Sequence, residues 1–147
     1  MNRDFVEMLS ALSAEKADFL LVGAHALSVY GIPRSTGDMD LWVRPTAENA
    51  MRVWRALEAF GAPLAELTAQ DFARPDTVVQ FGVPPNRIDL LTALSALDFE
   101  RAWEPRLSVR VEGLDVPVLS REDFVANKRA VGRPKDLSDI ALLGELV

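Results

Sequence analysis

The stretch from Phe19 to Val43, FLLVGAHALSVYGIPRSTGDMDLWV, constrains the fold of this chain more than any other. A short apolar run ends at Gly23, and a helical segment follows it. A turn rich in Gly, Pro and Ser then leads to a second apolar run that opens with Asp38 and Asp40. Residues two apart in a strand point to the same face of the sheet. Two carboxylates on one face of an apolar strand are poorly explained by stability, and a bound metal would explain them.

A third aspartate extends this pattern. Asp38 and Asp40 are separated by about 7 Å of strand, so their oxygens can converge on a hard cation, but aspartates at a strand entrance are also common in solvated loops. Asp89 lies between two apolar residues of another apolar run and therefore points away from them. If the two strands are neighbours, three carboxylates share one surface and repel each other unless divalent cations bind. The alternative is an edge-strand Asp89 paired with Arg87.

Hydrophobic periodicity, together with capping and turn residues, predicts an α+β chain in which a mixed β-sheet is flanked by helices. We expect one domain over residues 1–147, with a helical C-terminal segment. The predicted helices cover 4–14, 24–30, 47–60, 97–103, 121–131 and 135–146, with one or two helical turns within 64–72. The predicted strands cover 18–22, 38–43, 77–83, 86–91, 107–111 and 114–119, the last four forming two hairpins.

The charge and the cysteine content of the chain exclude some classes of function and of metal site. The net charge of −6 argues against a general nucleic-acid binder, because that affinity depends on Lys and Arg neutralising phosphates. The chain contains no cysteine, which excludes disulfides and thiolate metal sites and favours a cytoplasmic location. No apolar run approaches the ~20 residues of a membrane helix, so we expect no membrane partner.

Two further features have both a functional and a structural interpretation. Gly23 opens a strand-to-helix turn, where backbone N–H groups favour a phosphate, although glycine also ends strands for steric reasons. The run NKRAVGRPKDLSDIALL gives an acidic protein four cations within eight residues, Lys128 and Arg133 among them. These cations could bind phosphate or could belong to a solvated helix junction, and Asp136 in the following helix suits a capping role. His25, the only histidine, is interpreted as a packed or capping residue.

These motifs resemble the nucleotidyltransferases of the DNA polymerase β superfamily. The narrower resemblance is to small bacterial nucleotidyltransferase-like proteins, including abortive-infection toxins of type IV toxin–antitoxin systems. In that group a Gly-Gly or Gly-Ser turn precedes R-x-T-x-D-x-D, which here reads Arg34-Ser35-Thr36-Gly37-Asp38-Met39-Asp40. A later K-x-x-x-x-R-x-K-D-x-x-D pattern is matched by Lys128, Arg133, Lys135, Asp136 and Asp139. The resemblance spans about 20–143 and implies the nucleotidyltransferase fold.

The resemblance also implies a reaction and its residues. The protein would move NMP from an NTP to a hydroxyl on RNA, tRNA included, or on protein, within a toxin–antitoxin system that supplies a partner protein. Asp38, Asp40 and Asp89 would be catalytic and would hold Mg²⁺, with Asp89 as general base. The residues that would bind the nucleotide are Gly23, Ala24, Arg34, Thr36, Lys128 and Arg133.

One position departs from the family pattern. Ala24 stands where the family has a second Gly or a Ser, so the hydroxyl that commonly contacts the nucleotide phosphates is missing. The alternative function is therefore a catalytically weak or inactive binding or regulatory module that acts through a protein partner. Metal-dependent hydrolysis is a third interpretation, since it uses the same carboxylates.

Overall fold

A mixed six-stranded sheet with the strand order β3-β4-β2-β1-β6-β5 forms the centre of the protein. The computed structural model describes residues 1–32 and 37–144. The strands are β1 (Phe19–Val22), β2 (Asp38–Val43), β3 (Val78–Phe81), β4 (Arg87–Leu91), β5 (Leu107–Val111) and β6 (Leu114–Val118). The helices are α1 (Arg3–Ala14), α2 (Gly23–Val29), α3 (Ala47–Phe60), α4 (Phe99–Trp103), α5 (Arg121–Val131) and α6 (Pro134–Leu142), with a 3₁₀ helix η1 (Ala69–Ala73). The predicted α+β class, a mixed sheet flanked by helices, is confirmed.

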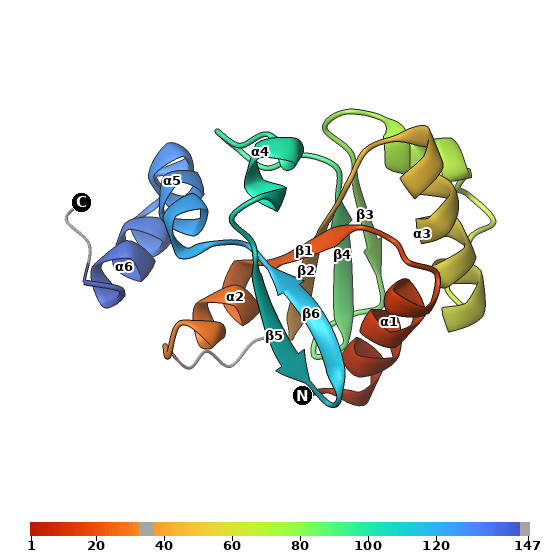
Figure 1. Cartoon of the computed structure of the whole chain (residues 1–147), viewed down its shortest axis with the longest axis horizontal. Helices are drawn as coiled ribbons and strands as arrows, with labels where there is room; N and C mark the ends of the chain where they lie inside the picture. Colours follow the sequence, from red (N-terminus) through yellow and green to blue (C-terminus); the bar gives the residue numbers. More distant parts are fainter. Residues whose placement is uncertain (33–36, 145–147) are drawn as a thin grey trace.

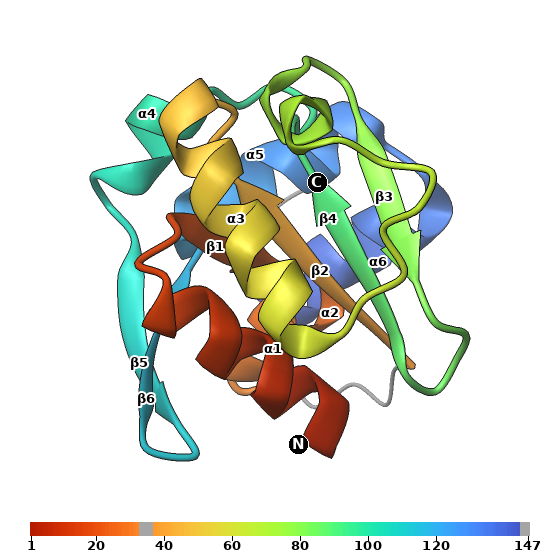
Figure 2. The same ribbon diagram turned by 90° about the vertical axis from the view of Figure 1, so that its right-hand side faces the viewer.

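The helices lie on both sides of the sheet. Figure 2 shows α1 and α3 next to each other in front of the strands, while α2, α5 and α6 lie behind them. In Figure 1 the same arrangement appears from the side, with the C-terminal pair α5 and α6 at the opposite end from α3. The sheet therefore has one face covered by α1 and α3 and another face toward α2 and the C-terminal helices.

Strand pairing brings the two predicted aspartate strands together. β1 runs antiparallel to β2 and parallel to β6, and β2 runs parallel to β4. The two predicted hairpins, β3–β4 and β5–β6, form as antiparallel pairs. The strand that carries Asp89 is thus an inner strand of the sheet, with β3 rather than β4 at its edge.

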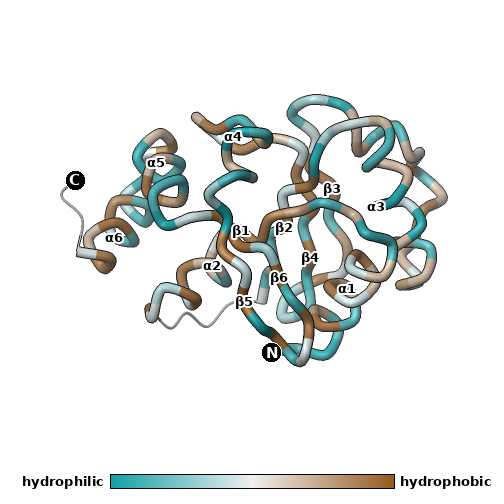
Figure 3. The backbone as a smooth tube through the Cα atoms, viewed as in Figure 1, coloured by the Kyte–Doolittle hydropathy of each residue, from teal (hydrophilic) through white to brown (hydrophobic). Residues whose placement is uncertain are grey.

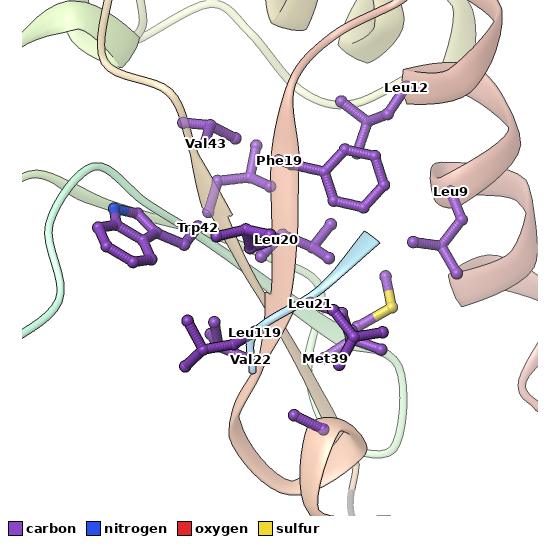
Figure 4. Close-up of a cluster of buried hydrophobic side chains, with 14 of the residues drawn as sticks. Leu9, Leu12, Phe19, Leu20, Leu21, Val22, Met39, Trp42, Val43 and Leu119 are labelled. Atoms are coloured by element: carbon purple, nitrogen blue, oxygen red, sulfur yellow. The ribbon is translucent and has the colours of Figure 1, made fainter. Parts of the chain in front are cut away.

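The central strands supply much of the core. All four residues of β1 are buried, and Figure 3 shows β1 in the brown of hydrophobic residues. In Figure 4, Phe19 points toward Leu9 and Leu12 of α1, whereas the ring of Trp42 points away from that helix. Trp42 is 1% exposed and packs edge-on against Phe99 of α4, with 5.1 Å between ring centroids. Trp42 is therefore a core residue on the face that also carries Asp38 and Asp40.

Two predicted helix starts are confirmed by capping contacts. The Thr46 side chain accepts a hydrogen bond from the backbone N–H of Asn49, and the Ser120 side chain accepts one from Asp123. The last helix differs from the prediction, since α6 ends at Leu142 rather than at residue 146. Gly144 follows with a φ of +81°, a conformation that ends helices, and residues 145–147 lie outside the described part of the chain. None of the helices described is long and apolar enough to cross a bilayer.

Candidate active site

Three carboxylates meet on one face of the sheet. In the parallel pair β2–β4, Asp40 is the direct partner of Asp89, and Asp38 is the partner of Arg87. Since alternate residues share a face, Asp38, Asp40 and Asp89 project to the same side. The expectation that the two strands are neighbours is confirmed. β1 completes the group from the other side, because Val22 pairs with Asp40 and places the turn at Gly23 beside it.

The proximity of these carboxylates changes the acidity of Asp40. Burial, followed by the charge of Asp89, a hydrogen bond to Asp89 and the charge of Asp38, raises the pKa of Asp40 from 3.8 to about 6. The positive charge of Arg87 acts in the opposite direction but is the smallest of these influences. Burial and the two neighbouring aspartates therefore favour the protonated form of Asp40.

Arg87 lies between two of the acids. Its Nη2 is 3.1 Å from Asp38 Oδ2, and its Nε is 3.2 Å from Asp89 Oδ1. Gln80 approaches the same carboxylate from β3, with 3.5 Å between its Nε2 and Asp89 Oδ2. The Arg87–Asp89 pair that was the alternative interpretation thus exists, but on an inner strand and with Asp38 as a second partner.

The donor chemistry suits a hard divalent cation, since Mg²⁺ prefers carboxylate oxygens. Asp89 and Asp38 also add to the raised pKa of Asp40 through their negative charges, after the larger contribution of burial. Within residues 1–32 and 37–144, however, no three His, Asp or Glu side chains are arranged to share one metal ion. The guanidinium of Arg87 lies against oxygens of Asp38 and Asp89 that a metal ion would use.

Gly23 makes close approach to Asp40 possible. It has a φ of +68° at the start of α2. A Cβ at this position would collide with Asp40 Oδ2 and would lie 3.2 Å from Asp40 Cγ. Position 23 therefore needs glycine both for its backbone conformation and for the space that the Asp40 carboxylate occupies.

We expect Gly23→Ala to destabilise the protein by about 1–3 kcal/mol, because alanine must adopt a left-handed conformation and displace the Asp40 side chain. Urea denaturation followed by circular dichroism measures this. Gly31→Ala is the matched control, since Gly31 also has a positive φ of +90° but no atom of the described residues within 4 Å of its Cβ position. Equal losses in the two variants would show that backbone strain alone, and not the Asp40 contact, explains the effect.

The helix after the turn is held by its own contacts. Ala24 occupies the first turn of α2, whose N-terminus has no side-chain cap. His25 packs edge-on against Phe5 at 5.3 Å between ring centroids, and burial lowers its pKa, opposed by a hydrogen bond to the backbone of Asp38. The Tyr30 hydroxyl donates to the backbone oxygen of Leu119. His25 is thus a packed residue that also supports the strand carrying Asp38.

The C-terminal cations Lys128 and Arg133 bind carboxylates of α6. Lys128 Nζ lies 3.3 Å from Asp136 Oδ1 and 3.9 Å from Asp139 Oδ2. Arg133 Nε lies 2.7 Å from Asp136 Oδ2, and the same carboxylate accepts the backbone N–H of Arg133 as a cap of α6. The structural interpretation of this cluster is thereby supported. A contribution of Lys128 and Arg133 to nucleotide binding stays a prediction, as does that of Arg34 and Thr36, which lie outside the described residues.

Two contacts of the site were missed in the sequence. The Arg87–Asp38 pair joins different strands, so only the β2–β4 register reveals it. Gln80 stands opposite Asp89 in the β3–β4 hairpin. Counting back from the turn around Pro84 and Pro85 could have indicated Gln80, because hairpin pairing follows from turn geometry.

Comparison with solved structures finds the same fold in nucleotidyltransferases. The lincosamide antibiotic adenylyltransferase LnuA with bound lincomycin matches with a TM-score of 0.64 and 15% identity, over 100% of this chain and 98% of its own. The antibiotic-resistance factor ANT(2'')-Ia matches with a TM-score of 0.63 and 15% identity, over 95% of this chain and 80% of its own. TM1012, a Thermotoga maritima protein assigned to the nucleotidyltransferases, matches with a TM-score of 0.62 and 15% identity. The match covers 95% of this chain and 89% of TM1012.

The sequence itself identifies the family. No curated protein matches it significantly. A family model described as "Nucleotidyltransferase of unknown function (DUF6036)" matches residues 3–144, nearly the whole chain. This extent agrees with the likeness of the fold to nucleotidyltransferases and with the position of the three aspartates. The chain belongs to the DUF6036 family of nucleotidyltransferases.

Proposed function

We propose that this protein is a Mg²⁺-dependent nucleotidyltransferase that moves NMP from an NTP to a hydroxyl on RNA, tRNA included, or on protein. The observation that carries the proposal is the convergence of Asp38, Asp40 and Asp89 on paired strands beside the turn at Gly23. Nucleotidyltransferases generally use divalent metals. Oxygen-only ligands favour Mg²⁺ among them.

The three aspartates have distinct tasks in this proposal. Asp38, Asp40 and Asp89 would hold the metal, which would polarise the phosphate oxygens and make the acceptor hydroxyl more acidic. Asp89 accepts the proton of that hydroxyl as general base. The hydroxyl oxygen forms a bond to the α-phosphorus, the bond from the α-phosphorus to the β-phosphate oxygen breaks, and pyrophosphate leaves.

The remaining predicted residues bind the nucleotide. Backbone N–H groups of Gly23 and Ala24 begin α2 beside Asp40 and can donate to phosphate oxygens. Arg34, with Thr36 in the same motif, and the cations Lys128 and Arg133 supply charge and hydrogen bonds to the triphosphate. Since Asp136 holds Lys128 and Arg133 in the free protein, nucleotide binding requires at least one of them to change partner.

The cellular role follows from the motif likeness. The Arg34-to-Asp40 motif resembles that of abortive-infection toxins, which supports a place in a toxin–antitoxin system with a neutralising partner protein. The absence of cysteine supports a cytoplasmic site of action. Co-purification with the product of a neighbouring gene would test this part. Recovery of the protein alone from its native host would contradict it.

Incubation of the protein with labelled NTPs, Mg²⁺ and cell extract is expected to label RNA or protein, and Asp38→Asn should reduce this labelling at least about 100-fold, since it removes a carboxylate beside the reacting phosphates. Nuclease and protease treatment then identify the acceptor. Asp115→Asn is the control, because it removes an exposed aspartate that pairs with Arg110 on β5.

Three outcomes would contradict parts of the proposal. Equal labelling by Asp38→Asn would exclude this site. Label recovered only in small molecules would correct the acceptor, and it would fit LnuA and ANT(2'')-Ia, whose structures contain lincomycin and adenylyl-2''-tobramycin. Phosphate release without any labelled acceptor would indicate hydrolysis.

A second candidate is a binding or regulatory module without turnover. Two observations favour it: Arg87 occupies oxygens of two of the three carboxylates, and Ala24 supplies no hydroxyl. Calorimetry separates the candidates. The enzyme binds NTP in the presence of Mg²⁺, whereas a module of this kind binds neither NTP nor Mg²⁺ and forms a stable complex with its partner protein.

A further inference from the structure

Arg87 is held at the site by both its backbone and its side chain. It opens β4, and its backbone N–H donates to the backbone oxygen of Gly37 at 2.9 Å. Its side chain is 32% exposed and reaches Asp38 on the neighbouring strand and Asp89 two residues along its own strand. The guanidinium therefore spans two strands on the face that carries all three aspartates.

One nitrogen of the Arg87 guanidinium, Nη2, donates hydrogen bonds to both carboxylates. Nη2 lies 3.1 Å from Asp38 Oδ2 and 3.3 Å from Asp89 Oδ2, while Nε lies 3.2 Å from Asp89 Oδ1. The arginine side chain is a cation that donates several hydrogen bonds from a planar group. It serves as the counter-ion of Asp38 and Asp89 without any external cation.

A divalent cation at this site would compete with that arrangement. An ion held by Asp38 and Asp89 takes the oxygens to which Arg87 donates, and it brings two positive charges close to the guanidinium. The two cations therefore exclude each other from the same carboxylates. The exposed part of the Arg87 side chain faces solvent, so the guanidinium can move outward while the backbone of β4 stays in place.

We propose that Arg87 is an internal counter-ion that occupies the position of the divalent cation between Asp38 and Asp89 in the free protein, and that metal binding displaces it. Arg87 thereby keeps the affinity for a metal ion alone low, so that the ion enters with the negatively charged nucleotide. This inference rests on the proposed metal site. Arg87 acts through the aspartates and is a positioning residue rather than a catalytic one.

Mn²⁺ binding without nucleotide, followed by electron paramagnetic resonance, tests the proposal. Arg87→Gln is expected to bind Mn²⁺ about tenfold or more tightly than the unmodified protein, because it removes a competing charge next to the ligands. Arg87→Lys retains the charge and should stay within about threefold of the unmodified protein. Arg110→Gln is the matched control, since it removes an exposed arginine–aspartate pair between β5 and β6 and should leave Mn²⁺ binding unchanged.

A further variant locates the ion. Arg87→Gln combined with Asp40→Asn should lose the gain in affinity, and circular dichroism confirms that each variant is folded. The inference is overturned if Arg87→Gln binds Mn²⁺ no more tightly than the unmodified protein, or if neither protein binds it. It is also overturned if the tighter binding of Arg87→Gln remains after Asp40→Asn is added. The labelling assay judges the proposed function separately. If the protein labels an acceptor but Arg87→Gln does not bind Mn²⁺ more tightly, the proposed function stands and the role of Arg87 is wrong. If Arg87→Gln binds Mn²⁺ more tightly but no acceptor is labelled, the role of Arg87 stands and the proposed function is wrong.

Discussion

Asp40→Asn is expected to make the protein more stable while abolishing nucleotidyl transfer. The pKa of Asp40 is raised from 3.8 to about 6 by burial, by Asp89 and by Asp38, so the ionised carboxylate is unfavourable in the folded protein at neutral pH. Asparagine has nearly the same shape without the charge. A gain of about 1–3 kcal/mol in the free energy of unfolding is expected at pH 7.5 in EDTA, because a pKa difference of one unit corresponds to ~1.4 kcal/mol.

The stability difference between Asp40→Asn and the unmodified protein should depend on pH. Between pH 6 and 4 the folded protein binds a proton at Asp40 that the unfolded chain has lost, so the unmodified protein gains stability as the pH falls through this range. The advantage of Asp40→Asn should therefore shrink from pH 7.5 to pH 4. Asp115→Asn, at an exposed pair, is the control and should change stability by less than about 0.5 kcal/mol. A variant less stable than the unmodified protein at pH 7.5 would contradict the charge repulsion.

The three aspartates could be predicted from the sequence because charged residues within apolar strands do not favour stability. Apolar alternation fixes which face of β2 and β4 each residue occupies, because a shift of one residue would expose the whole apolar set. Asp38, Asp40 and Asp89 break that pattern on a single face. Residues that violate local rules without a structural gain are expected at functional sites.

The partners of the cations could not be predicted in this way. Arg87 has a long side chain that reaches across strands, and its pairing with Asp38 depends on a register that only the folded sheet defines. From the sequence, Lys128 could equally bind a phosphate or a carboxylate. In the folded protein α5 packs against α6, and this packing places Lys128 next to Asp136. The spacing of residues in the sequence shows which of them share a face of a strand. Which partner a long charged side chain contacts depends on tertiary packing.

Asp136→Asn is expected to destabilise the protein by about 3 kcal/mol, measured by urea denaturation at pH 7. Asp136 has no exposed surface and pairs with both Lys128 and Arg133, and Lys128 is itself only 12% exposed along its side chain. Asparagine keeps the capping hydrogen bond to Arg133 but removes the charge. A buried lysine that loses a partner costs several kcal/mol, because its own desolvation is no longer offset.

Asp71→Asn is the matched control for this prediction. Asp71 caps η1 through the backbone N–H of Thr68 at 2.8 Å and pairs with Arg74, but it has no buried lysine beside it. Its replacement should cost less than about 1 kcal/mol. Similar losses at positions 71 and 136 would show that capping, rather than the buried pair, explains both.

The pH dependence of the Asp136 pair follows from two pKa shifts that are both downward, one of an acid and one of a base. The Arg133 guanidinium, together with Lys128, lowers the pKa of Asp136 from 3.8 to about 2, so its stabilisation is complete above pH 3.8 and is lost as the pH falls toward 2. Burial lowers the pKa of Lys128 from 10.5, so the loss in Asp136→Asn should diminish as the pH rises toward 10.5, where the uncharged lysine no longer needs a partner. If nucleotide binding takes Lys128 or Arg133 from Asp136, as the proposed function requires, the NTP must replace this stabilisation. Asp136→Asn should then retain NTP binding despite its lower stability.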